Sequence, residues 1–171
     1  MTTMLRPASL QPGTAPYPRL GPLLPGVGRV PGAEAAFATF CREHEEVYRR
    51  YADAVTGDPA TGERVVRAAF LELRAQWFTA LRSPAPSALA WTLLCATSAT
   101  SRTVTMRALE RALDSRQVDA LVLRHRLGLT SQQAAHAMGL TPAAFELLRR
   151  SALRRAATIP ATAHMPPSDA L

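Results

Sequence analysis

The stretch SQQAAHAMGLTPAAFELLRR, from Ser131 to Arg150, holds residue types that suit contact with nucleic acid. A glycine follows a short helical pattern, and a Thr-Pro pair then opens a second helical pattern that ends in arginines. Two helices that meet at a tight glycine turn are typical of a helix-turn-helix, whose second helix enters the major groove of DNA. Guanidinium groups on that helix suit contacts with phosphate. The stretch therefore predicts a DNA-binding element.

The second helix of this element presents few hydrogen-bonding groups at the end that would enter the groove. Ala143 and Leu147 suit contact with a thymine methyl group, and Glu146 suits acceptance of a hydrogen bond from cytosine N4. Arg150 and Arg154 suit phosphate contacts. The apolar pair also fits a contact with another protein, so a second interpretation stays open. The predicted DNA-binding residues are Ser131, Gln132, Thr141, Ala143, Glu146, Leu147, Arg149, Arg150 and Arg154.

The distribution of charge along the chain favours the same region. The net charge is +7, and all 20 basic residues are Arg. Residues 106–159 carry nine Arg and four acidic residues, whereas residues 33–105 carry eight of each. Positive charge concentrated around a predicted helix-turn-helix is what binding to phosphate requires. A solvated basic face is the alternative explanation.

No pattern of side chains indicates a catalytic or metal site. The four histidines and two cysteines show no ligand spacing along the chain. We interpret His44 as a core or boundary residue, His136 as a surface residue, and the acidic group Glu43, Glu45 and Glu46 as a solvated helix face. Nucleophile–base arrangements and phosphate-binding glycine loops are also missing from the sequence. We therefore expect no enzyme activity, no catalytic residue, no metal, no cofactor and no small-molecule substrate.

The sequence also bears on the compartment. Cys41 and Cys95 lie far apart and give no disulfide framework, which favours a reducing environment. The N-terminus lacks the pattern of a signal peptide, and the longest apolar stretch is too short to span a bilayer. We expect a soluble, cytoplasmic protein without membrane contact.

Helical periodicity dominates the region that must position these residues. From 33 to 157 the apolar residues recur every three or four positions, and no segment alternates with a period of two. The predicted fold class is all-α, with two small helical modules. The predicted domains are a disordered Pro/Gly-rich leader (1–32), a helical module (33–104), a short linker (105–112), the helix-turn-helix module (113–157) and a flexible tail (158–171).

Taken together, the two modules resemble the extracytoplasmic-function (ECF) type of bacterial RNA polymerase sigma factor, a sigma-70 family protein with a helical region 2 and a helix-turn-helix region 4. The likeness covers about 35–157. FCREHEEVYRRYADAVTGDPATGERVVRAAFLELRAQW is similar to the first helices of region 2. PSALAWTLLCAT is similar to the helix that approaches the −10 promoter element, with Trp91 at its recurrent Trp. LDSRQVDALVLRHRLGLTSQQAAHAMGLTPAAFELLRRSALRRA resembles region 4.

The resemblance implies a transcription factor that binds RNA polymerase core and double-stranded promoter DNA to direct initiation. It also implies a regulatory protein partner, such as an anti-sigma factor. On this reading the residues that contact polymerase or another partner are Arg64, Arg67, Glu72 and Arg74.

Three departures from the family pattern favour an alternative. Arg64 and Arg67 stand where the family usually has an acid and a Gln, and the Trp91 helix runs on into TSATSRT. About ten residues, 104–113, connect the modules and can span at most ~35 Å, whereas promoter elements two DNA turns apart lie ~70 Å apart. The alternative is a degenerate sigma-derived protein that binds a regulatory partner, or modulates another sigma factor, without reading promoters itself.

Overall fold

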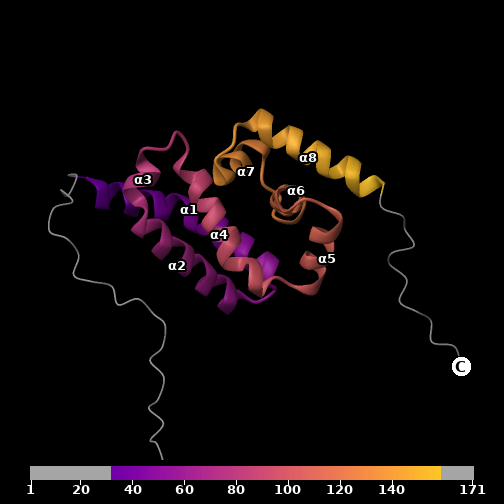
Figure 1. Cartoon of the computed structure of the whole chain (residues 1–171), viewed down its shortest axis with the longest axis horizontal. Coiled ribbons are helices and arrows are strands. Elements are labelled where there is room, and N and C mark those ends of the chain that lie inside the picture. Colours follow the sequence, from indigo (N-terminus) through magenta and orange to yellow (C-terminus); the bar gives the residue numbers. More distant parts are fainter. Residues whose placement is uncertain (1–31, 159–171) are drawn as a thin grey trace, which may run out of the picture. The chain divides into compact units, whose positions relative to one another are not determined.

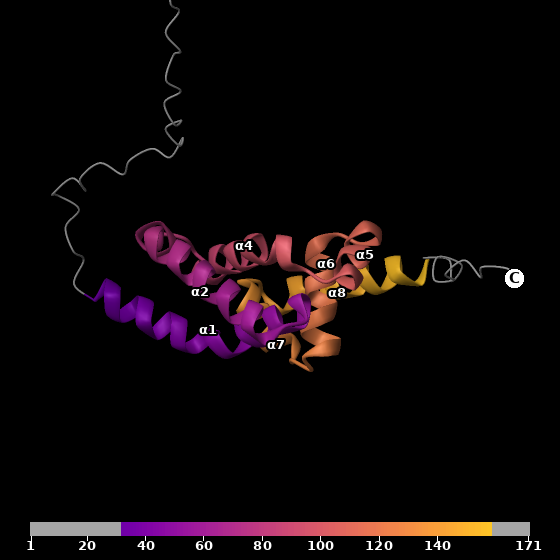
Figure 2. The same ribbon diagram turned by 90° about the horizontal axis from the view of Figure 1, so that it is seen from below.

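The computed structural model describes residues 32–158, and the predicted leader and tail lie almost entirely outside this range. Within it every regular element is a helix, which confirms the all-α prediction (Figures 1 and 2). No helix in this range is long and apolar enough to cross a membrane. The elements are α1 (Ala33–Thr56), α2 (Pro59–Ala75), α3 (Trp77–Leu81), α4 (Pro86–Ser98), the 3-10 turn η1 (Ala99–Ser101), α5 (Val104–Ala112), α6 (Ser115–Leu121), the π-helical segment η2 (Val122–Arg126), α7 (Ser131–Met138) and α8 (Pro142–Ala157).

The boundary between α1 and α2 follows from four residues, Thr56 to Pro59. Gly57 takes a left-handed conformation (φ 73°), and its N–H donates to the carbonyl of Asp53 at 2.8 Å. Asp58 then caps α2, because its carboxylate accepts from the N–H of Thr61 at 2.9 Å, and Pro59 occupies the first helical position. These are standard stop and start signals, and they explain why α1 ends and α2 begins here.

The predicted linker, 105–112, lies within α5. Thr103 caps this helix by accepting from the N–H of Met106 at 3.3 Å, and the N–H of Thr103 donates to Val55 at the end of α1. Met106 and Leu113 are buried. Because both its cap and its apolar side chains are in contact with the rest of the fold, the connection is a packed helix.

The predicted helix-turn-helix is formed by α7 and α8. Thr130 and Gln133 make a capping box at the start of α7, and Thr141 caps α8. Gly139 takes the left-handed conformation (φ 66°) at the turn, and the N–H of Leu140 donates to the carbonyl of Ala135 at 2.9 Å. This bonding satisfies the carbonyl groups at the end of α7 and reverses the chain, as the sequence predicts.

The helices of the two predicted modules share one hydrophobic core among the described residues. In this packing α7 lies between α4 and α8, and α6 packs against α8 (Figure 1). We call the packing of α6 and α7 against α1 and α4 the closed arrangement. The largest fully buried apolar and aromatic side chains come from both modules: Tyr48, Tyr51, Val55, Leu73, Leu94, Val118, Leu123, Met138 and Phe145.

Candidate functional site

The outward side of α8 is the part of the helix-turn-helix that is available to a ligand. Helical spacing places Phe145 and Ala152 in the core, where both are 0% exposed, and turns Leu147 outward with 69% exposure. Ala143, Arg150 and Arg154 are exposed with it. We call these four outward residues, Ala143, Leu147, Arg150 and Arg154, the α8 face. A shallow hollow on this face is lined by Ala143, Glu146, Leu147 and Arg150.

Glu146, at the edge of the α8 face, is held by its own neighbours. Its carboxylate accepts hydrogen bonds from Arg149 Nε (3.1 Å), Arg149 Nη2 (2.9 Å) and the Ser131 hydroxyl. The bonds from Arg149 and then from Ser131 lower the pKa of Glu146 to about 2. The carboxylate is therefore ionised and its acceptor sites are largely used, which leaves little capacity for a bond from cytosine.

The remaining arginines of α8 have no ion pair as close as that between Arg149 and Glu146. Arg150 Nε lies 4.0 Å from Glu146, whereas Arg154 and Arg155 have no carboxylate within 4.0 Å among residues 32–158. Of the other predicted DNA-binding residues, Gln132 near the start of α7 and Thr141 at the N-cap of α8 are exposed. The Thr141 hydroxyl already accepts from the N–H of Ala144. The fold thus brings Ser131 of α7 against Glu146 of α8, with Arg154 free of a carboxylate partner within 4.0 Å among residues 32–158 and Arg150 at the limit of that distance from Glu146.

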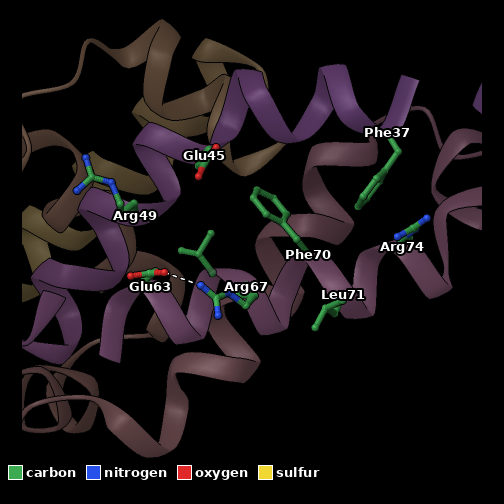
Figure 3. A pocket seen from close by; sticks show the side chains of 9 residues that line it. Phe37, Glu45, Arg49, Glu63, Arg67, Phe70, Leu71 and Arg74 are labelled. Carbon is green, nitrogen blue, oxygen red and sulfur yellow. Dashed lines mark hydrogen bonds and ion pairs between the residues drawn. The ribbon is translucent and has the colours of Figure 1, made fainter. Parts of the chain in front are cut away.

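The predicted partner-binding residues are all exposed on α2 but face different surroundings. Arg67 and Arg74 line a groove of about 260 Å³ between α1 and α2, together with Phe37, Phe70 and Leu71 (Figure 3). Arg67 pairs with Glu63 at 2.6 Å, and Arg74 pairs with Glu34 at 3.2 Å. Leu71 is 63% exposed. Outside this α1–α2 groove, Arg64 lines a separate shallow hollow, and Glu72 lines neither.

Trp91 is buried beneath α6 at 2% exposure. Its indole Nε1 donates to the carboxylate of Asp119 at 3.3 Å. The same carboxylate accepts from the Tyr51 hydroxyl, from Cys95 Sγ at 3.3 Å and from Arg102 Nη2 at 3.5 Å. We call these five residues, Tyr51, Trp91, Cys95, Arg102 and Asp119, the Asp119 cluster.

The donors of the Asp119 cluster keep their protons. Burial, reinforced by the charge of Asp119, raises the pKa of Tyr51 and of the Cys95 thiol well above their ordinary values. Arg102 also pairs with Glu110. A carboxylate that is 1% exposed and accepts from one guanidinium and three neutral donors is well compensated. The cluster joins α1, α4 and α6, so Trp91 is covered by the second module.

Sequence reasoning did not identify Asp119. It lies in an otherwise apolar run, VDALVL, and an acid on the buried side of a helix is the only local sign of such a partner. Its four donors are 17 to 68 residues away along the chain. Helical periodicity relates residues three or four positions apart, so it cannot predict contacts over that separation.

The chain has only low sequence identity to the known proteins that it resembles in structure. No protein-family model and no curated protein matches it. One solved structure to which it is similar is the complex of the anti-anti-sigma factor PhyR with the anti-sigma factor NepR from Bartonella quintana. The match has 24% identity, covers 69% of this chain and 48% of that chain, and has a TM-score of 0.45. A second is the RsbN–BldN complex, with 23% identity, 73% and 96% coverage, and a TM-score of 0.29.

Proposed function

We propose that the chain is a DNA-binding transcription regulator of the sigma-factor type. The observation that carries this proposal is the α8 face, the exposed side of a capped helix-turn-helix. On it Arg154 has no carboxylate within 4.0 Å among residues 32–158, and Arg150 Nε lies 4.0 Å from Glu146. Cations at this place suit the phosphates that flank a major groove. With Glu146 engaged by Arg149, base contacts are limited to the methyl-sized surfaces of Ala143 and Leu147. Binding is therefore strong in its phosphate component and weak in sequence discrimination.

RNA polymerase core is the protein partner of this proposal, and the α1–α2 groove is its docking surface. The groove combines apolar side chains, Phe37, Phe70 and Leu71, with Arg67 and Arg74, which are paired with Glu63 and Glu34. Apolar residues surrounded by arginines are typical of protein interfaces. The helix that carries Trp91 is similar to the one that approaches the −10 promoter element, and contact between the Trp91 indole and a DNA strand would require Trp91 to leave the Asp119 cluster.

Replacement of Arg150 and Arg154 by Ala tests the DNA-binding part. We expect affinity for a duplex to fall, and the slope of log K against log salt to decrease in magnitude by about one to two, because each lost phosphate contact removes about one released counterion. Fluorescence anisotropy with a labelled duplex over a salt series measures both quantities. The matched control is R42A/R82A, which removes the same charge from exposed positions outside α8. Equal slopes in the two double variants would contradict contact between the α8 face and phosphate.

Transcription with purified core polymerase tests the sigma-like part. The expected result is that the protein binds core and directs initiation at some promoter. If the protein bound duplex DNA but neither bound core nor supported initiation, the DNA-binding part of the proposal would stand and the sigma activity would be excluded.

A second candidate function is supported by the exposed apolar residues. Leu147 at 69% exposure lies in a hollow on the α8 face, and this arrangement suits a contact with a regulatory protein as well as with DNA. In that case the protein modulates another factor and does not read promoters. Leu147→Gln distinguishes the two candidates, because it would disrupt an apolar protein contact while leaving the phosphate contacts of Arg150 and Arg154 in place.

A further inference from the structure

Two histidines that are 92 positions apart in the sequence meet where α1 packs against α7. The rings of His44 on α1 and His136 on α7 have centroids 4.9 Å apart with an interplanar angle of 26°. The carboxylate of Glu43 lies beside them. One ligand atom from each of the three residues lies within 4.8 Å of the other two. Two imidazoles and one carboxylate are therefore clustered where the two helices meet.

The hydrogen bonding of His44 fixes which of its nitrogens is available. Its Nδ1 lies 2.9 Å from the carbonyl oxygen of Phe40, and a carbonyl only accepts, so Nδ1 carries the proton. In the neutral ring Nε2 then carries the lone pair.

The lone pair of His44 has no partner in the described part of the chain. His44 is 3% exposed, and its Nε2 is a buried polar atom without a hydrogen bond to any residue of 32–158. A buried acceptor without a partner costs free energy, so a group that accepts the lone pair would stabilise the fold. The ring is also held in place, because Phe40 stacks on it at a centroid distance of 4.1 Å.

We propose that Glu43, His44 and His136 bind a divalent transition-metal ion of the kind that prefers imidazole, with zinc as the principal member of this class. Two His nitrogens and one Glu oxygen are a common set of protein ligands for zinc, and a water molecule completes the tetrahedron. Donation from Nδ1 to a backbone carbonyl is the outer contact that typically orients a metal-binding histidine. Glu43 and His136 are exposed, so rotation of their side chains supplies the closer approach that an ion requires.

The position of the site gives it a structural role. Its ligands come from α1 and α7, so a bound ion would link the two predicted modules directly. Tyr48, one turn beyond His44, already donates to the carbonyl of Ala137 at 3.1 Å across the same contact. The metal therefore stabilises the closed arrangement, in which Trp91 is buried. This inference concerns the contact between α1 and α7 and does not depend on DNA binding.

Titration of the full chain with Zn²⁺ alone tests the proposal. We expect saturable binding of one ion at this site by calorimetry, and Co²⁺ should give the visible absorption bands of a four- or five-coordinate site. At a 100-fold excess of free Zn²⁺ over its Kd, Tm should rise by about 5–10 °C. His136→Ala should weaken binding by at least about 100-fold, more than loss of an outer contact would. Glu43→Gln should weaken it as well.

The matched control is His125→Ala, which removes an exposed histidine of η2 outside the cluster and should bind Zn²⁺ as the unmodified chain does. Because His136 is exposed, H136A should keep its Tm in the absence of metal, so that loss of binding is not loss of folding. Binding that persists in H136A would place the ion elsewhere on the chain and overturn the proposal. Absence of saturable binding to the unmodified chain would overturn it too.

Discussion

Replacement of Asp119 by Ala is expected to lower the free energy of unfolding by about 3–5 kcal/mol, because it removes one carboxylate of a buried ion pair and leaves the buried donors of Tyr51, Trp91 and Cys95 without this acceptor. Arg102 would keep only Glu110 as a carboxylate partner, at a position where its side chain is 3% exposed. Trp91 Nε1 would lose the acceptor to which it donates. Denaturation in urea measures the loss, and Tm should fall by about 10–15 °C.

Glu63→Ala is the matched control for Asp119→Ala, because it also removes a carboxylate from an ion pair with an arginine. The Glu63–Arg67 pair is exposed, and such pairs contribute at most about 1 kcal/mol. Asp119→Asn should lie between the two, since it keeps an acceptor oxygen but removes the negative charge. If D119A were no less stable than E63A, the Asp119 cluster would not hold α6 against α1 and α4.

Although Asp119→Ala should lower the stability of the fold, we expect it to increase binding to polymerase core and promoter DNA. The cluster stabilises the closed arrangement, so its loss shifts the population toward conformations in which Trp91 is accessible. Under our proposal, D119A at a temperature where it stays folded should bind polymerase core and promoter DNA together more readily than the unmodified chain. If Tm decreased without any gain in this binding, the Asp119 cluster would stabilise the fold but would not control binding to core and promoter DNA.

The helices and their ends were predictable because the residues that specify them are neighbours in sequence. Asp58 and Pro59 start α2, and Thr141 and Pro142 start α8, through contacts that reach no further than three residues. Gly139 ends α7 by the same local rule. The inward side of the helix-turn-helix follows from helical spacing, and the structure places Phe145 as expected.

The relation between the two predicted modules was not predictable from such local rules. It depends on Tyr51, Trp91 and Asp119, whose contacts span 28 to 68 residues. The cluster of His44 with His136 likewise needs α7 to lie on α1, and spacing along the chain gives no sign of it. The engagement of Glu146 by Arg149 also appears only in three dimensions, because helical geometry allows this pair without requiring it.

Gly139→Ala should reveal how tightly α7 is held against α4. A Cβ at this position would lie 2.2 Å from the backbone nitrogen of Ala88 and 2.6 Å from its Cα, and neither backbone atom can move without moving α4. The substitution also forces an L-residue into a left-handed conformation, which costs about 1–2 kcal/mol, and overpacking adds about 1–3 kcal/mol. We therefore expect the free energy of unfolding to fall by about 2–5 kcal/mol in urea denaturation.

Gly128→Ala separates the two contributions. Gly128 has nearly the same conformation (φ 69° against 66° at Gly139), but a Cβ added there would meet nothing within 4 Å. G128A should therefore lose only the conformational contribution, and its difference from G139A measures the contact between α4 and α7. Because that contact joins the two predicted modules, G139A should also expose Trp91 more often, whereas G128A should not. Equal destabilisation by the two substitutions would mean that α7 does not rest on Ala88 in solution, and that the closed arrangement is maintained without this contact.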